Sequence, residues 1–228
     1  TLSSSSAASD VYKRQTMDFS SWLAFVAVAL LVTFSPGPAV VMVISNAVSH
    51  GPGRAMIGSL GNALGLIAVA AAATAGLGVV LAASATAFLA VKLLGAAYLI
   101  YLGIRQWRSR APSLGHAPAP GGHAPTQAWR LFAHGVWVAL TNPKTILFFS
   151  ALFPQFVHTG QPVLPQLLVL IPTFAACDLL SHAFYALLAR GLRTQLTHAS
   201  RIRLVNRIFG GTFVALGIGL LGLRSKTA

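Results

Sequence analysis

One acidic residue, Asp178, lies inside an apolar run, and the chain contains only three acidic residues in all. A charged carboxylate in a bilayer costs about 2.5–3.5 kcal/mol on insertion scales, so Asp178 should face the protein interior and have a partner or a function. The chemistry open to this residue is binding of a proton or of an ammonium group. The alternative is structural, with Asp178 paired to Lys144 so that the pair holds two helices together.

His182 follows Asp178 by four residues, so a helix would place both side chains on one face. The two residues could relay a proton or form half of a metal site. The sequence offers no further Asp, Glu or Cys to complete a metal site, since Cys177 is the only cysteine. A satisfied polar pair is the simpler interpretation, and we expect no bound metal.

Two proline-containing segments interrupt apolar runs, and they read Ser35-Pro36-Gly37-Pro38 and Asn142-Pro143-Lys144. Proline has no backbone donor and clashes with the carbonyl one turn earlier, so each segment should break a helix and free backbone polar groups. Inside a bilayer these groups must be satisfied by protein, water or a bound molecule. The alternative is a simple kink, but two breaks at matching places favour a binding site.

Pro36, Lys144 and Asp178 are predicted to lie at one depth in the membrane. At 1.5 Å per residue they stand roughly 18, 22 and 16 Å above the inner ends of their helices. Broken helices and charged residues in one central layer are typical of a site near the bilayer midplane.

The elements that carry these residues are six apolar runs, each about long enough to cross a hydrocarbon core of roughly 30 Å. The runs are 19–48, 55–82, 87–107, 129–153, 163–189 and 204–223. The chain has 55% apolar and only 8% charged residues, whereas a soluble domain carries about 25% charged residues. We therefore expect an all-α integral membrane bundle of six transmembrane helices, with lipid around it.

Basic residues indicate the orientation of the bundle and argue against nucleic acid as a partner. The formal charge is +13, but Arg and Lys lie between the apolar runs and form no basic face with interleaved aromatic residues. The basic connections follow the first, third and fifth runs and contain Arg54, then Arg105, Arg108, Arg110 and Arg130, then Arg190, Arg193, Arg201, Arg203 and Arg207. The positive-inside rule assigns these connections to the cytoplasm and the amino terminus to the outside, although Arg224 and Lys226 run against it.

The chain divides into two groups of three runs, residues 17–110 and 129–228. The segment 111–128 between them is rich in Pro, Gly, Ala and His and is predicted to be a flexible cytoplasmic linker. Residues 1–16 are serine-rich without an apolar core, so we interpret them as a non-native or disordered tail and not as a secretory signal. Three crossings per half would invert the second half relative to the first, and inverted repeats with matched helix breaks are typical of transporters.

Small residues in the second run are interpreted as packing residues. Gly61 and Gly65 lie about one turn apart and flank Asn62 on the same stretch of chain. Residues this small let membrane helices approach closely, so we expect a helix partner at this position.

Three ordered motifs resemble the lysine-exporter (LysE-type) superfamily, most closely its homoserine/threonine-resistance (RhtB-type) branch. They are SPGPAVVMVISNAVSHGPGRAMIGSLGNALG at 35–65, VKLLGAAYLIYLGIRQWR at 91–108 and TNPKTILFFSALFPQFV at 141–157. Asp178 followed by Tyr185 also fits the fifth span of the family. Many relatives carry Asn or Asp directly after the PGP motif, where this chain has Ala39, and this departure bears on the choice of substrate.

The resemblance implies a multi-pass carrier of the bacterial inner membrane that exports amino acids or close derivatives by proton antiport, without a cofactor. On this reading the substrate-binding residues are Ser35, Pro36, Gly37, Pro38, Asn142, Pro143, Lys144 and Asp178, and the proton-coupling residues are Asp178 and His182. Lys144 would attract a substrate carboxylate, and Asp178 would bind the substrate ammonium or the coupling proton.

Two other functions are kept as alternatives. A cation or heavy-metal exporter of the same superfamily would suit the same fold, but acidic and thiolate ligands are scarce. An integral membrane enzyme would need an acid/base or metal cluster, and the cytoplasmic loops contain no Asp or Glu. The expected partners are an amino acid and membrane lipid, not nucleic acid, and a homodimer is left open.

Overall fold

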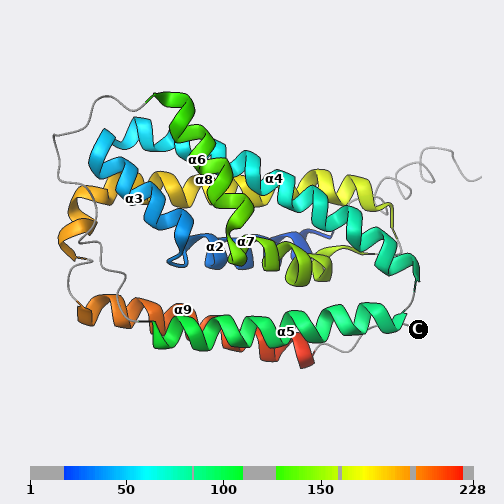
Figure 1. Cartoon of the computed structure of the whole chain (residues 1–228). Helices are drawn as coiled ribbons and strands as arrows, with labels where there is room; N and C mark the ends of the chain where they lie inside the picture. The colour runs from blue at the N-terminus through cyan, green and yellow to red at the C-terminus, as the bar shows by residue number, and fades with distance from the viewer. Residues whose placement is uncertain (1–17, 84, 110–126, 159–160, 196–198, 223–228) are drawn as a thin grey trace, which may run out of the picture.

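The computed structural model describes residues 18–83, 85–109, 127–158, 161–195 and 199–222, and every regular element among them is a helix (Figure 1). The helices are α2 (Phe19–Phe34), α3 (Pro38–His50), α4 (Pro52–Ala83), α5 (Ala85–Arg108), α6 (Ala128–Thr141), α7 (Pro143–Leu147), the π-helix η2 (Phe148–Leu152), the 3-10 helix η3 (Phe153–Phe156), α8 (Val163–Gln195) and α9 (Ala199–Gly222). The predicted all-α class is confirmed. The tail predicted at 1–16 and nearly all of the linker predicted at 111–128 lie outside the described residues.

Two helical stretches among the described residues are long and apolar enough to cross a membrane alone, Pro52–Ala75 in α4 and Val163–Ala189 in α8. Two bent pairs meet the same criterion when each pair is taken as one span, α2 with α3 and α6 with Pro143–Phe156. The described residues therefore support two to four spans. Large apolar side chains also point outward, with Leu94 71% and Leu187 74% exposed, as suits a protein surrounded by lipid.

Both bends fall where the sequence contains proline. The axes of α2 and α3 differ by 58°, and those of α6 and the segment Pro143–Phe156 by 50°. Pro36 and Pro38 lack the amide hydrogens that would otherwise bond to carbonyls four residues earlier, so α2 ends at Phe34. Pro38 and Pro143 then open α3 and α7, where a helix leaves its first amides without partners in any case. The two predicted helix breaks are confirmed.

The second broken helix does not return to regular α-geometry. The five-residue α7 leads directly into the π-helix η2, which is followed by the 3-10 helix η3. A π-turn contains about one residue more than an α-turn, and such turns are frequent at functional sites.

An aromatic cluster joins α2, α8 and the irregular segment η2–η3. Phe25, Phe148, Phe149, Phe153 and Phe174 are each at most 3% exposed. The ring centroids of Phe148 and Phe174 lie 4.4 Å apart, and Phe25 meets Phe153 edge to face at 5.9 Å. Such pairs add about 0.5–1.5 kcal/mol beyond their area burial, so the cluster fixes the irregular segment against α2 and α8.

Helix backbones touch in two pairs, α4 with α6 and α5 with α9. A Cβ atom on Gly61 would overlap the carbonyl oxygen of Phe132 in α6, and one on Gly65 would come within 2.7 Å of the same helix. In the other pair, a Cβ on Gly103 would lie 2.6 Å from the carbonyl oxygen of Gly210. A Cβ on Gly210 would likewise lie 2.6 Å from the carbonyl oxygen of Gly103. The prediction that Gly61 and Gly65 allow close helix packing is confirmed.

The helix ends that carry basic residues gather at one end of the bundle. The starts of α4, α6 and α9 and the ends of α5 and α8 all lie toward the left of Figure 1. Arg54, Arg105, Arg130 and Arg203 at these ends are exposed. This arrangement agrees with the predicted orientation, in which these ends share the cytoplasmic side.

Candidate functional site

The carboxyl end of α2 leaves four backbone carbonyls inside the protein. The last four carbonyls of any helix lack an amide partner within it, and here the prolines that follow remove two amides nearby. Each of these four oxygens accepts a hydrogen bond from a side chain of another element. The acceptors are the carbonyls of Val32, Thr33, Phe34 and the C-cap residue Ser35, and the donors are Lys144, Ser181 and Tyr185. The Val32 carbonyl also accepts from the Ser35 backbone N–H at 3.3 Å.

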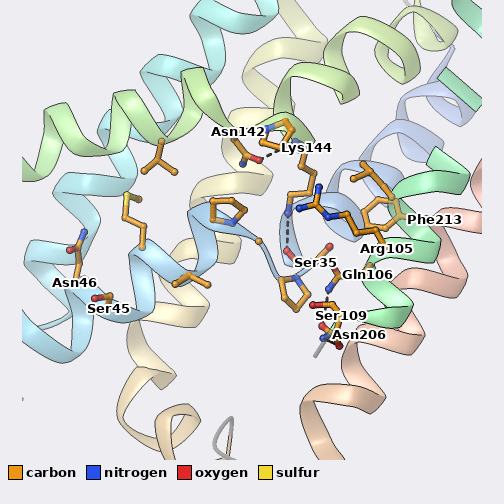
Figure 2. A pocket seen from close by; sticks show the side chains of 18 of the residues that line it. Ser35, Ser45, Asn46, Arg105, Gln106, Ser109, Asn142, Lys144, Asn206 and Phe213 are labelled. Atoms are coloured by element: carbon orange, nitrogen blue, oxygen red, sulfur yellow. Dashed lines mark hydrogen bonds between the residues drawn. The ribbon is translucent and has the colours of Figure 1, made fainter. Parts of the chain in front are cut away.

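Lys144 reaches from the second helix break to the first. Its Nζ donates to the carbonyl of Ser35 at 2.8 Å (Figure 2). It also donates to the carbonyl of Val32 at 3.0 Å. The side chain of Asn142 caps α7, since its Oδ1 accepts from the backbone N–H of Lys144 at 3.1 Å. A cation at the carboxyl end of a helix is also favoured by the helix dipole. The second break thus supplies a positive charge to the first.

Two hydroxyl groups of α8 bind the other two carbonyls. Tyr185 Oη donates to the carbonyl of Phe34 at 2.7 Å, and Ser181 Oγ donates to that of Thr33 at 3.2 Å. The sequence analysis missed Ser181 and included Tyr185 only through the family resemblance. Their spacing from Asp178, three and seven residues, could have identified them as one polar face of an apolar helix.

A cavity of about 660 Å³ borders the first break, between α3 and α6 on one side and α5 and α9 on the other (Figure 2). Cavities of about 300–1,000 Å³ suit small-molecule ligands. The structure brings seven of the predicted site residues to its wall: Ser35, Pro36, Gly37, Pro38, Asn142, Pro143 and Lys144. Val41, Met42 and Val138 add an apolar surface to the same wall.

The described residues around the cavity give it a positive character. Arg105 and Lys144 line it, His134 lies beside them, and the lining residues include no Asp or Glu. Such a wall attracts an anionic group and disfavours a second cation. Lys144 was predicted from the sequence, whereas Arg105 was interpreted only as a marker of orientation.

A polar network closes the cavity wall between α5 and α9. Gln106 Nε2 donates to Asn206 Oδ1 at 2.8 Å, and Asn206 Nδ2 donates to the carbonyl of Ser109 at 3.2 Å. Asn206 is only 1% exposed although it lies in an apolar run. The sequence analysis missed these residues. The available signal was Asn206, an amide side chain within the sixth apolar run.

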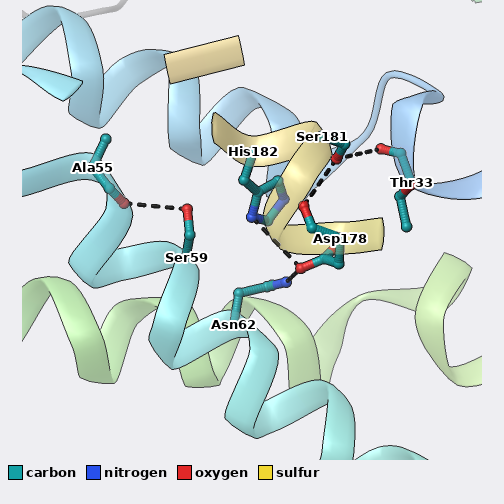
Figure 3. A network of polar contacts seen from close by, with 7 residues as sticks. All are labelled: Thr33, Ala55, Ser59, Asn62, Asp178, Ser181 and His182. Atoms are coloured by element: carbon teal, nitrogen blue, oxygen red, sulfur yellow. Dashed lines mark hydrogen bonds and ion pairs between the residues drawn. The ribbon is translucent and has the colours of Figure 1, made fainter. Parts of the chain in front are cut away.

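Asp178 and His182 lie together in a second polar group, separate from the cavity lining (Figure 3). Asp178 is 6% exposed and His182 is fully buried. Asn62 Nδ2 of α4 donates to Asp178 Oδ2 at 2.9 Å, and His182 Nδ1 lies 3.6 Å from the same oxygen. Ser181 Oγ is within hydrogen-bond distance of the Asp178 carbonyl as well as that of Thr33, so it connects this group to the end of α2.

The described residues hold no ion pair between Asp178 and Lys144, because the Lys144 ammonium binds carbonyls instead. Both ring nitrogens of His182 and Oδ1 of Asn62 are buried without a hydrogen-bond partner. The predicted pairing of Asp178 with Lys144 is therefore not present among the described residues. The predicted pair of Asp178 and His182 is present as a contact of 3.6 Å, which is longer than a hydrogen bond.

Within the described part of the chain, no three His, Cys, Asp or Glu side chains come together. Asp178 and His182 thus gain no third ligand of these types there.

An apolar helical bundle with a cavity at a broken helix has the features of a membrane transport protein. The chain belongs to the LysE type translocator family, which it matches over residues 30–223. The family resemblance seen in the motifs is confirmed, and with it the expectation of a membrane transporter, not an enzyme.

Several relatives cover most of this chain. It is 36% identical over 211 residues to the homoserine/homoserine lactone efflux protein of Salmonella typhi, which covers 91% of this chain and 99% of that protein. It is 36% identical over 202 residues to an uncharacterized membrane protein of Vibrio cholerae, with 89% and 97% covered. The leucine efflux protein of Salmonella choleraesuis is 31% identical over 134 residues, 59% of this chain and 62% of that protein. No solved structure gives a significant match.

Proposed function

We propose that this protein exports amino acids or close derivatives across the bacterial inner membrane by proton antiport. The observation that carries the proposal is the cavity at the α2–α3 break, where a helix carboxyl end, a helix amino end and Lys144 meet. An α-amino acid carries an ammonium and a carboxylate on one carbon, so it is complementary to adjacent carbonyl and cationic groups. Relatives named for efflux of homoserine, homoserine lactone and leucine support the same substrate class.

The carboxylate subsite in this proposal consists of Lys144 and the amino end of α3. The first amides of α3 have no partner within the helix, and the helix dipole adds positive potential there. Ser35 Oγ is buried without a hydrogen-bond partner beside the same cavity, so it is available to a bound substrate. Met42 and Val138 supply apolar surface for the substrate side chain.

The direction of transport follows from the position of the cavity. Arg105 and Ser109 at the end of α5 and Asn206 near the start of α9 line it. If the basic ends face the cytoplasm, as the positive-inside rule predicts, the cavity receives substrate from the cytoplasm. An exporter requires a loading state of this kind.

Proton coupling is proposed for Asp178 with His182. Asp178 lies on the α8 side of the α2 end, where its carboxylate contacts Asn62 of α4 and His182. A buried carboxylate that takes up or releases a proton changes such contacts, and the helix that carries it, α8, binds the end of α2 through the hydroxyl groups of Ser181 and Tyr185. Substrate binding and proton exchange would then act on opposite sides of one helix break.

Six membrane crossings in two inverted repeats remain part of this proposal. All six predicted runs coincide with helices, and the first helix of each half is broken at a proline by a similar angle, 58° and 50°. These matched breaks support an inverted repeat. Association into a homodimer stays a prediction.

The direct test is uptake of radiolabelled amino acids into everted membrane vesicles, with and without a protonophore. Homoserine and leucine come first in the panel, and vesicles without the protein are the control. We expect uptake of one or a few amino acids that collapses when the protonophore is added. Uptake of no amino acid, in vesicles shown to contain the inserted protein, would contradict the proposal, and uptake insensitive to the protonophore would contradict the coupling.

A further inference from the structure

The Lys144 side chain holds an ammonium group against backbone carbonyls, and an α-amino acid carries the same group. Nζ lies 2.8 Å from the Ser35 oxygen and 3.0 Å from the Val32 oxygen. It also lies against the PGP segment, since a Cβ atom on Gly37 would be 3.2 Å from Nζ. Ser35, Gly37 and Lys144 all line the cavity.

The four carbonyls at the end of α2 receive two kinds of donor. Thr33 and Phe34, which are not among the cavity-lining residues, have their carbonyls bound by the uncharged hydroxyl groups of α8. The carbonyls of Val32 and Ser35 are bound by the Lys144 ammonium, and the Val32 carbonyl also accepts from the Ser35 backbone N–H at 3.3 Å. A hydroxyl is therefore sufficient to satisfy a buried carbonyl at this helix end. The ammonium is found at the cavity, because Lys144 and Ser35 line it, whereas Val32 does not.

We propose that the carbonyls of Val32 and Ser35 form an ammonium-binding subsite, which Lys144 occupies as a tethered plug while the cavity is empty. This inference rests on the proposed function, because it names the subsite for the substrate ammonium. A substrate carboxylate in the cavity attracts Nζ more strongly than neutral carbonyls do. Lys144 then pairs with the carboxylate, and the substrate ammonium takes its place at the carbonyls.

The exchange conserves the polar contacts of the site. Before binding, one ammonium serves two carbonyls. After binding, the substrate ammonium serves those carbonyls and the Lys144 ammonium serves the substrate carboxylate. The described residues hold no ion pair between Lys144 and a protein carboxylate, so Nζ is available for this role.

The plug makes a carboxylate near the substrate ammonium a requirement for binding. A carboxylate can draw Lys144 away, whereas a simple amine cannot. A simple amine also meets the positive charge of Arg105 and Lys144 in the cavity wall. Lys144 thus acts as a specificity-determining residue.

The test compares ligand binding by purified wild type, Lys144→Met and Lys144→Arg in lipid nanodiscs. The probes are leucine and 3-methylbutylamine, which is leucine without its carboxylate, with homoserine and 3-aminopropan-1-ol as a second matched pair. We expect Lys144→Met to bind the amines about tenfold or more tightly than wild type does, because the carbonyls are open and a charge-assisted hydrogen bond contributes about 1.5–3 kcal/mol. Lys144→Arg should exclude the amines as wild type does.

Arg130→Met is the matched control for loss of one positive charge. Arg130 is exposed, stacks on the ring of Trp129 at 5.6 Å and does not line the cavity. If Lys144→Met, shown to be folded, binds the amines no better than wild type and Arg130→Met do, the carbonyl subsite is refuted. A purely structural role of Lys144 predicts that negative result.

A second measurement on wild type needs no variant. We expect 4-methylpentanoate, which keeps the carboxylate, to compete with leucine better than 3-methylbutylamine does, and the reverse order overturns the plug. The outcomes also separate this inference from the proposed function. Amine binding by Lys144→Met without any amino-acid transport by wild type would refute export and keep the subsite, whereas transport without amine binding would refute only the subsite.

Discussion

The break between α2 and α3 and the break between α6 and α7 differ in the hydrogen-bond partners of their backbone groups. At the second break, backbone groups find hydrogen-bond partners within the same short segment. Asn142 N–H donates to the Ala139 carbonyl at 3.3 Å, and Asn142 Oδ1 accepts from the Lys144 amide at 3.1 Å. At the first break Ser35 N–H donates to the Val32 carbonyl in the same way, at 3.3 Å, but the carbonyls of residues 32–35 also accept from side chains of α7 and α8. Both breaks have a local backbone hydrogen bond, and the first also has side-chain donors from neighbouring helices.

This difference assigns different tasks to the two breaks. Hydrogen bonds within one short segment persist when neighbouring helices move. Hydrogen bonds between elements change when a helix shifts or when a ligand competes for them. Under the proposed function, the first break would therefore respond to substrate and to α8, whereas the second break would present Lys144 to it.

The largest expected effect comes from Lys144→Met, which removes the link between the two breaks. Two carbonyls lose a charged donor and the cavity loses a cation, and charge-assisted hydrogen bonds contribute about 1.5–3 kcal/mol each. Amino-acid uptake into everted vesicles should fall by about 100-fold or more. Arg130→Met, at an exposed position outside the cavity, should transport at the wild-type rate. Uptake by Lys144→Met close to that of the control would show that the first break does not depend on the second.

Asp178→Asn tests the opposite side of the first break and should have the next largest effect. The amide can still accept a hydrogen bond from Asn62, but it cannot exchange a proton. Proton-driven uptake should drop by about tenfold, on the scale of one lost proton-transfer or charge interaction, while exchange of labelled for unlabelled amino acid continues. Both are measured in the same vesicles. An inserted variant that transports at the wild-type rate with unchanged pH dependence would rule out the coupling role.

Gly61→Ala tests whether helix packing holds α6, and with it the second break, in place. The added methyl group would overlap the Phe132 carbonyl, so α4 and α6 must separate, at a cost of about 1–3 kcal/mol in the free energy of unfolding. Thermal unfolding in detergent measures this loss. Gly219→Ala in α9 is the control, since its Cβ would meet nothing within 4 Å. Equal unfolding temperatures for the two variants would contradict the close approach.

Tyr185→Phe should have the smallest effect, because it removes one of several donors at the first break. The Phe34 carbonyl loses its 2.7 Å hydrogen bond, and a single neutral hydrogen bond contributes about 0.5–1.5 kcal/mol. Thermal unfolding is again the measurement. Tyr101→Phe removes a hydroxyl from a side chain that is 53% exposed, and it should leave stability unchanged. A Tyr185→Phe protein as stable as this control would mean that the first break tolerates an open carbonyl.

Local chemistry made part of this structure predictable from sequence. Proline acts on the four residues before it, so Pro36, Pro38 and Pro143 fixed both breaks without knowledge of the rest of the fold. Counting along helices also predicted that Pro36, Lys144 and Asp178 lie at one depth. In the structure Lys144 binds carbonyls at the first break, and so does Ser181, three residues after Asp178.

Contacts that depend on the rotation of one helix against another were not predictable. Spacing within a helix does not say whether Lys144 meets Asp178 or the carbonyls of α2. The same limit hid Ser181 and the Gln106–Asn206 hydrogen bond, which joins residues 100 positions apart. These contacts depend on how closely the helices pack, and that distance depends on glycines in other parts of the chain.

The glycine contacts of the two helix pairs also have a mechanical consequence. Helices in backbone contact cannot slide along each other without a collision between carbonyl oxygens and Cα atoms. The pair α5 and α9 should therefore move as one rigid unit, and the pair α4 and α6 as another. The cavity lies between the α5–α9 pair and the helices that carry the breaks. If export requires the cavity to open to one side of the membrane and then to the other, α5 and α9 should therefore swing together, with a hinge outside both helix contacts.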